Sequence, residues 1–385
     1  MSLDPVNLAS DLIKIKSITP HGKEAINLIK SILENHGFDC KILTFGEGED
    51  EVVNLYARFG KKSPNLCFAG HVDVVPEGST EDWSFGPFSG EIINDQLCGR
   101  GAVDMKSSIA TFISSAIEFL EENNSFESLG SISFIITSDE EGKAINGTKK
   151  VVEWLKNNKE HIDDCIVGEP TNPDKLGDMI KIGRRGSYSG NLIVNGIQGH
   201  VGYPHLAKNP INSMLKLIQP LTEVELDKGN ENFEPSTIMI TSIDVGNPSY
   251  NIIPAKVSVK FNIRFNNLHS SKSLTKLLTE KFETLNIFNY SFDYFCNAEP
   301  FFTNPGHLVG SLKRAIKSIT GLVPNLSTNG GTSDARFIRD ICPVVEFGLV
   351  GKLMHKVDEK VSIDDIHNLK KIYKNFLEIY FAKVI

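Results

Sequence analysis

The sequence predicts an α/β fold in which a larger domain, with a mostly parallel central sheet flanked by helices, carries an inserted α+β domain of two layers. Three observations predict it. Helical and strand-like patterns alternate between residues 25 and 168, which is typical of a parallel sheet. After residue 182 the pattern changes, and the strand-like segment 257–265 alternates apolar with polar residues. From about residue 301 the helix-rich pattern resumes and continues to residue 381.

The first part of the chain supplies the alternating elements. Asp4 and Pro5 are placed as the N-cap and first residue of a helix, with none of the cationic and apolar blocks of a signal peptide. Residues 25–36 show a helical period that stops at Gly37. The further predicted elements are strands at 52–57, 65–68, 132–137 and 165–168, and helices at 105–121 and from 148.

The inserted part begins after residue 182. Apolar residues alternate with polar ones from Val257 to Phe265, which predicts a strand with one buried and one exposed face. The other predicted elements are strands at 187–194 and 238–245 and helices at 211–226, with a kink at Pro220, and 271–285. A sheet with an exposed face or edge can join another chain. The last predicted helix, 363–381, belongs to the larger domain.

Length and charge limit the possible classes of protein. A chain of 385 residues is too long for one ordinary core, and we predict domain segments 1–181, 182–297 and 298–385. The net charge of −8 argues against a nucleic-acid partner. No segment is long and apolar enough to cross a membrane. Six cysteines without paired spacing are typical of reduced thiols in a cytoplasmic protein.

Charged side chains follow several of the predicted strands. His71 and Asp73 come after the apolar run 66–69, and Glu140 and Glu141 come after the run 132–137. Asp104 follows a glycine-flanked stretch, 99–103. Open α/β sheets bind ligands beyond the carboxyl ends of their strands, and imidazole with carboxylates is a common set of metal ligands. This order of residues therefore predicts a metal site.

The same residues, in this order, resemble the co-catalytic zinc amidohydrolases of the aminoacylase and carboxypeptidase G type. The resemblance extends over nearly the whole chain. Its further motifs are Val167-Gly168-Glu169-Pro170-Thr171, Gly183-Arg184-Arg185-Gly186-Ser187, the segment from Gln198 to His205, Asn251-Ile252-Ile253-Pro254, Gly330-Gly331-Thr332-Ser333-Asp334 and His355-Lys356-Val357-Asp358-Glu359. The double arginine, the Tyr203-Pro204-His205 segment and the Gly330–Asp334 loop resemble the desuccinylase branch of this family.

The resemblance implies two Zn²⁺ ions per subunit, with Co²⁺ as a possible substitute. It assigns Asp104 to a position between the two ions. His71 and Glu169 would complete one site, and Glu141 and His355 the other. The carboxylate of Asp73 is expected to orient the imidazole of His71, and a cis peptide is expected between Asp104 and Met105.

The resemblance also implies the catalytic roles. Glu140 is expected to act as the general base that takes a proton from the attacking water and passes it to the leaving amine. His200 is expected to reach the cleft of a partner subunit and stabilise the oxyanion there, which requires a homodimer formed through the inserted domain.

Substrate preference is expected to depend on carboxylates at the ends of the ligand, which guanidinium groups bind well. The candidate residues for substrate binding are Arg184, Arg185, Arg264, Asn251, Gly331, Thr332 and Ser333. The alternatives to a desuccinylase are another N-acyl-amino-acid deacylase, a metallocarboxypeptidase, or a catalytically silent metal-binding or oligomerisation protein. The intact Glu140 argues against the silent protein. The chain departs from the usual family pattern at Ser107, Gly202, Asn329 and Ala335.

Overall fold

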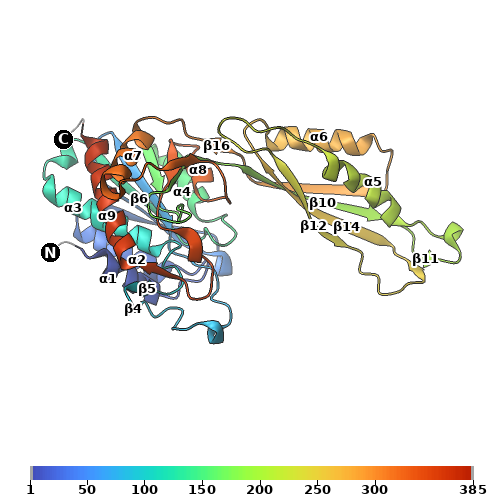
Figure 1. The fold of residues 1–385 in the computed structure, drawn as a ribbon, viewed down its shortest axis with the longest axis horizontal. Coiled ribbons are helices and arrows are strands. Elements are labelled where there is room, and N and C mark those ends of the chain that lie inside the picture. The colour runs from blue at the N-terminus through green and yellow to red at the C-terminus, as the bar shows by residue number, and fades with distance from the viewer. Residues whose placement is uncertain (1–2, 383–385) are drawn as a thin grey trace. The chain divides into compact units, whose positions relative to one another are not determined.

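The computed structural model describes residues 3–382, which form two compact units (Figure 1). The first unit contains the chain up to Ile182, Thr303–Ser327 and the chain from Ser333 onward. The second unit contains Gly183–Phe302 together with the short segment Thr328–Thr332. Within the second unit, β9 (Gly183–Arg184) pairs antiparallel with β16 (Phe301–Phe302), so the two ends of the inserted segment lie side by side.

The first unit is built on a sheet of eight strands. Their order is β1 (Asp39–Phe45), β2 (Val52–Phe59), β6 (Ser131–Thr137), β3 (Asn65–His71), β7 (Asp164–Val167), β18 (Val344–Glu346), β8 (Met179–Lys181) and β17 (Asn325–Ser327). The four central strands, β6, β3, β7 and β18, run parallel to one another. This arrangement confirms the predicted α/β fold with a mostly parallel central sheet.

Helices flank this sheet and contribute many of the buried apolar side chains around it. They are α1 (Pro5–Lys14), α2 (Lys23–Asn35), α3 (Lys106–Glu122), α4 (Thr148–Asn158), α7 (His307–Thr320), α8 (Ala335–Ile338) and α9 (Ile363–Phe381). α3 and α9 pack against each other (Figure 1). Between them and the sheet, the ring of Phe68 stacks on Phe112 with centroids 4.4 Å apart, and Tyr373 meets both rings edge-on. Large aromatic side chains buried in this way dominate the packing of a core.

Local sequence signals correctly predicted several helix boundaries. The side chain of Asp4 accepts a hydrogen bond from the backbone of Val6, with Pro5 as the first helical residue. Gly37, just after α2, has a positive φ of 84°, as expected for a left-handed residue that ends a helix. β1 was not predicted, because it lies at the edge of the sheet and buries only Leu43.

The second unit is an antiparallel sheet covered by two helices. The strand order is β12 (Thr237–Asp244), β14 (Lys256–Phe265), β10 (Gly186–Asn195) and β15 (Tyr290–Ala298). The predicted alternation in β14 is confirmed, since Val257, Val259, Phe261, Ile263 and Phe265 are all buried. They pack with side chains of α5 (Pro210–Glu223), which contains Pro220, and of α6 (Ser271–Glu283). β15 was not predicted, because most of its residues are exposed.

Besides the β9–β16 pair, two small sheets lie outside the two large sheets in the described part of the chain. β4 (Ile92–Ile93), β5 (Gln96–Cys98) and β19 (Lys360–Ser362) form a small antiparallel sheet in the first unit. β11 (Gly199–His200) pairs with β13 (Ile252–Ile253) in the second unit. None of the helices within residues 3–382 has the combination of length and apolar character that a bilayer span requires.

Candidate metal centre and active site

The carboxyl ends of three neighbouring strands deliver the candidate metal ligands of the first unit. His71 is the last residue of β3, Glu141 follows β6, and Glu169 follows β7. β6, β3 and β7 are adjacent and parallel, so their carboxyl ends meet at one edge of the sheet. Asp104 comes from the turn before α3, and His355 from the loop after the short helix Gly351–Leu353.

Asp104 lies between two histidines, and each of its oxygens faces a different one. Oδ1 is 3.2 Å from Nε2 of His71, and Oδ2 is 3.3 Å from Nε2 of His355. Glu169 completes the group around His71, with Oε1 3.9 Å from Nε2. Glu141 completes the group around His355, with Oε1 2.6 Å from Nε2. The structure therefore brings all five predicted ligands together as two groups that share one carboxylate.

The five candidate ligands are three carboxylates and two imidazoles, and the pKa values of several of these groups are shifted. Burial and the charge of Asp104 raise the pKa of Glu169 well above its usual range. Burial would also raise the pKa of Asp104, but hydrogen bonds from His355 and His71 hold it well below its usual range. Hydrogen bonds that His355 donates to Asp104 and Glu141 raise its pKa to about 10. Buried carboxylates that repel one another beside two imidazoles fit a site for divalent cations, whose charge would relieve the repulsion.

Asp73 contacts both the His71 ring and the loop that carries Glu140 and Glu141. Nδ1 of His71 lies 2.9 Å from the backbone oxygen of Asp73 and 3.7 Å from its carboxylate. The carboxylate instead accepts hydrogen bonds from the backbone nitrogens of Glu140, at 3.3 Å, and Glu141, at 3.0 Å. The structure thus differs from the expectation for Asp73: its backbone carbonyl, and not its carboxylate, contacts the imidazole, because the carboxylate is engaged by the backbone of the two glutamates.

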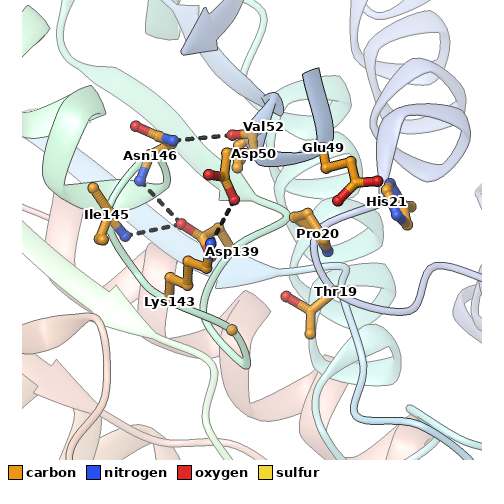
Figure 2. A pocket seen from close by; sticks show the side chains of 11 residues that line it. Thr19, Pro20, His21, Glu49, Asp50, Val52, Asp139, Lys143, Ile145 and Asn146 are labelled. Atoms are coloured by element: carbon orange, nitrogen blue, oxygen red, sulfur yellow. Dashed lines mark hydrogen bonds and ion pairs between the residues drawn. The ribbon is translucent and has the colours of Figure 1, made fainter. Parts of the chain in front are cut away.

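The loop after β6 is also held from its other side, by Asp139. The buried carboxylate of Asp139 accepts hydrogen bonds from the backbone nitrogens of Ala144, Ile145 and Asn146, at 2.9–3.0 Å. Figure 2 shows the bonds from Ile145 and Asn146. Consecutive side chains on an extended strand point in opposite directions. Glu140 and Glu141 lie beyond the end of β6, just before the turn that Asp139 fixes. They are therefore not bound to the alternating directions of side chains on a strand.

A pocket of about 530 Å³ lies against the flank of this loop (Figure 2). Its wall includes Thr19, His21, Glu49, Asp50 and Lys143, and Lys143 forms an ion pair with Asp50 at 2.7 Å. None of the five candidate ligands lines it. The pocket is therefore adjacent to the cluster of ligands and separate from it.

His200 and Asn251 lie together in the second unit. His200 pairs with Ile252 in the β11–β13 ladder, and the backbone nitrogen of Val201 donates to the backbone oxygen of Asn251 at 3.0 Å. The backbone nitrogen of Gly202 donates to Nδ1 of His200 at 3.0 Å. Nδ1 is then an acceptor, so the neutral ring carries its proton on Nε2. The exposed His200 therefore presents an N–H donor.

The candidate arginines also lie in the second unit. Arg184 lies on β9 and donates to the backbone oxygen of Asn329 at 3.4 Å. Arg185 donates to the backbone oxygen of Pro235 and is 3.6 Å from the carboxylate of Glu234. Burial, together with the charge of Arg185, lowers the pKa of Arg264 on β14. Two like charges near each other favour an anionic partner.

The predicted loop Gly331-Thr332-Ser333 is divided between the units, since Gly331 and Thr332 belong to the second unit and Ser333 to the first. Ser333 is buried and donates to Oε1 of Glu346 at 2.5 Å. The sequence analysis missed Glu346, although a carboxylate within the apolar run 344–349 is a signal of a buried charge with a defined partner. The cis peptide expected between Asp104 and Met105 is present.

Comparison with known proteins identifies the class of protein to which this fold and site belong. Residues 67–379 match the model of the peptidase family M20/M25/M40. Because the match covers most of the chain, the protein belongs to this family.

One curated relative is similar to this chain over nearly the full length of both proteins. The chain is 50% identical, over 383 residues, to the succinyl-diaminopimelate desuccinylase of Rhodospirillum centenum, an alignment that covers 99% of this chain and 98% of the relative.

Two solved structures share the fold. An M20 family metallo-carboxypeptidase from Sulfolobus solfataricus aligns with a TM-score of 0.78 at 18% identity, covering 98% of this chain and 99% of the other. A Bacillus subtilis protein described as a dinuclear metal binding peptidase from the M20 family aligns with a TM-score of 0.70 at 16% identity, covering 99% and 97%. At these identities the likeness concerns the fold alone.

Proposed function

We propose that this protein is a metal-dependent amide hydrolase that cleaves N-succinyl-L,L-2,6-diaminopimelate to succinate and L,L-2,6-diaminopimelate, a step of lysine and diaminopimelate biosynthesis. The observation that carries this proposal is the 50% identity to a relative of that activity over nearly the full length of both chains. The shared carboxylate of Asp104 between two histidines supports the metal-dependent mechanism.

The proposed cofactor is a pair of Zn²⁺ ions per subunit, with Co²⁺ as a possible substitute. His71 and Glu169 would hold one ion, Glu141 and His355 the other, and Asp104 both. Imidazole nitrogens and carboxylate oxygens are ligands that Zn²⁺ accepts. When bound, such a pair polarises a carbonyl and lowers the pKa of water.

Glu140 is the proposed general base. Burial raises its pKa, and the nearby imidazole of His71 only partly opposes this effect. A carboxylate with a raised pKa can accept a proton from the attacking water and release it again to the leaving amine nitrogen. Asp73 supports this role because it holds the Glu140 backbone beside His71.

The second unit is the proposed lid and dimerisation domain of a cytoplasmic homodimer. In this arrangement His200 acts in the cleft of the partner subunit, where its Nε2–H donates to the developing oxyanion. Arg184, Arg185 and Arg264 are the proposed partners of the substrate carboxylates, and Asn251, Gly331, Thr332 and Ser333 the proposed polar contacts. We propose neither a nucleic-acid nor a membrane partner.

One assay tests the proposed activity. The purified protein, loaded with Zn²⁺, is given N-succinyl-diaminopimelate, N-acetylornithine and a peptide with a free carboxyl end. We expect the largest kcat/KM for the succinyl compound, because a site built to pair guanidinium groups with carboxylates rejects an analogue that lacks one. A larger value for acetylornithine or for the peptide would contradict the proposal.

A further inference from the structure

One buried carboxylate outside the proposed ligand set is bonded to a loop that carries a ligand. The side chain of Glu359 is fully buried, and its Oε2 is 2.8 Å from Nη1 of Arg100. Its Oε1 accepts hydrogen bonds from the backbone nitrogens of Val103, at 2.9 Å, and Asp104, at 3.2 Å. Hydrogen bonds to a charged acceptor are about twice as strong as neutral ones. Glu359 therefore holds the backbone of the residue shared by both candidate metal groups.

The ion pair also reaches the loop that carries His355. Nη1 of Arg100 donates to the backbone oxygen of Lys356 at 3.0 Å. The indole of Trp83 lies 5.1 Å from the same guanidinium. The backbone oxygen of Glu359 accepts from the nitrogen of Gly99 at 2.9 Å. One pair of side chains, 259 residues apart in sequence, thus fastens the Asp104 loop to the His355 loop.

We infer that Glu359 is a positioning residue, which, through Arg100, sets the spacing between Asp104 and His355 and so the affinity of the cation site formed by Asp104, Glu141 and His355. This inference rests on the proposed function, because it requires that two cations bind. The contacts of Glu359 and Arg100, on which the inference is built, do not depend on the proposed function.

The two candidate metal groups depend on this pair to different extents. His71 and Glu169 lie at or just beyond the ends of β3 and β7, which are held by the central sheet. His355 lies in a loop, where it has a positive φ of 61°, and its side chain is 46% exposed. Loss of the pair should therefore loosen the His355 group more than the His71 group. A purely structural role would instead lower stability without distinguishing the two groups.

The test is titration of the metal-free, full-length protein with Co²⁺, followed by visible absorption. Glu359→Gln keeps the size of the side chain but turns an amide group toward Arg100 in place of a charge. We expect the loss to fall mainly on one Co²⁺, which should bind roughly ten- to a hundredfold more weakly, as is typical when a partner of a metal ligand is lost, while the other is affected much less. The titration of His355→Ala should show the same lost step. Two unchanged binding steps in Glu359→Gln would overturn the inference.

Glu160→Gln is the matched control. Glu160 pairs with Arg58 at 2.9 Å in the same unit, and Arg58 also bonds Ser131 at the start of β6, away from the carboxyl ends of the strands. This variant should lose stability but bind both Co²⁺ ions as the wild type does. An equal loss of Co²⁺ affinity in Glu160→Gln would attribute the effect to general destabilisation and overturn the inference.

A second variant covers the case in which Glu359→Gln fails to fold. Arg100→Lys keeps a cation for Glu359 but removes the guanidinium that also reaches Lys356. We expect a selective loss at the same binding step, and two unchanged steps would overturn the inference. If the wild type itself binds fewer than two Co²⁺ ions, the proposed dinuclear function fails; two ions bound tightly by both the wild type and Glu359→Gln would refute the positioning role alone.

Discussion

The carboxylate of Asp73 lies 3.0 Å from the backbone nitrogen of Glu141, while the backbone oxygen of Asp73 holds the ring of His71. A single residue thus ties a candidate ligand at the end of β3 to another candidate ligand after β6. The distance between the two ligands depends on this contact as well as on the pairing of the strands.

Asp73→Asn should slow turnover while the protein remains folded. Asparagine offers one oxygen and one NH₂ group where the carboxylate offers two acceptors, so one of the two backbone N–H groups of the glutamates loses its partner. We expect kcat to fall by roughly ten- to a hundredfold, the usual range for partners of metal-site residues. Steady-state kinetics of the Zn²⁺-loaded variant measures this.

Asp163→Asn is the control for this variant. Asp163 likewise accepts from a backbone nitrogen, that of Asn65 at 2.7 Å, but at the opposite end of β3. Its kcat should equal that of the wild type. A normal kcat in Asp73→Asn would show that the contact with the glutamate loop has no functional role.

Asp104→Ala should abolish the paired metal site. The two oxygens of Asp104 face His71 and His355, so its removal takes a ligand from both groups at once. Glu169→Ala and Glu141→Ala each remove a ligand from one group and should weaken mainly one site. Zn²⁺ content after dialysis measures the difference, and two tightly bound Zn²⁺ ions in Asp104→Ala would sink the proposed ligand set.

Glu140→Gln should retain its metal and lose its activity. Glutamine has the size of glutamate but cannot accept the proton of the attacking water, so kcat should fall by at least about a hundredfold. Metal content and kcat are measured on the same preparation. Glu49→Gln, an exposed carboxylate in the pocket beside the loop, serves as the control and should turn over normally. Near-normal turnover in a folded Glu140→Gln would mean that another group is the base.

His200→Ala tests whether the second unit completes the site of a partner subunit. Loss of one oxyanion donor typically reduces the rate by a factor on the order of a hundred to a thousand. The variant should keep its metal and fold, because His200 is exposed and lies outside the candidate ligand groups. Steady-state kinetics and Zn²⁺ content of the purified variant measure both expectations.

Mixing His200→Ala with Glu140→Gln gives a sharper result. A heterodimer has one cleft with an intact Glu140 and, from the partner subunit, an intact His200. Activity should return in proportion to heterodimer formation. If subunit exchange is verified and no activity returns, His200 does not act on the partner subunit.

Local patterns in the sequence were sufficient to predict the fold class and part of the candidate metal site, whereas Glu169 and His355 were assigned through the family resemblance. Alternation of apolar residues predicted β14, and a helical period ending at Gly37 predicted α2, because both depend on repeats of a few residues. Polar residues that directly follow buried strands indicated His71 and Glu141, since the ends of parallel strands converge. β1 and β15 escaped prediction because exposed edge strands have little apolar pattern.

Only the tertiary structure decided how these residues face one another. The sequence contains Asp73, Arg100 and Glu359, but it does not show which groups they contact. Only the structure shows that the carboxylate of Asp73 bonds the backbone of Glu141 and that Arg100 and Glu359 form a buried pair. It also does not indicate that Thr328–Thr332 group with Gly183–Phe302. Periodicity reports which side of an element is buried, whereas such contacts depend on how distant elements pack, because a buried charge must find its partner wherever the folded chain places one.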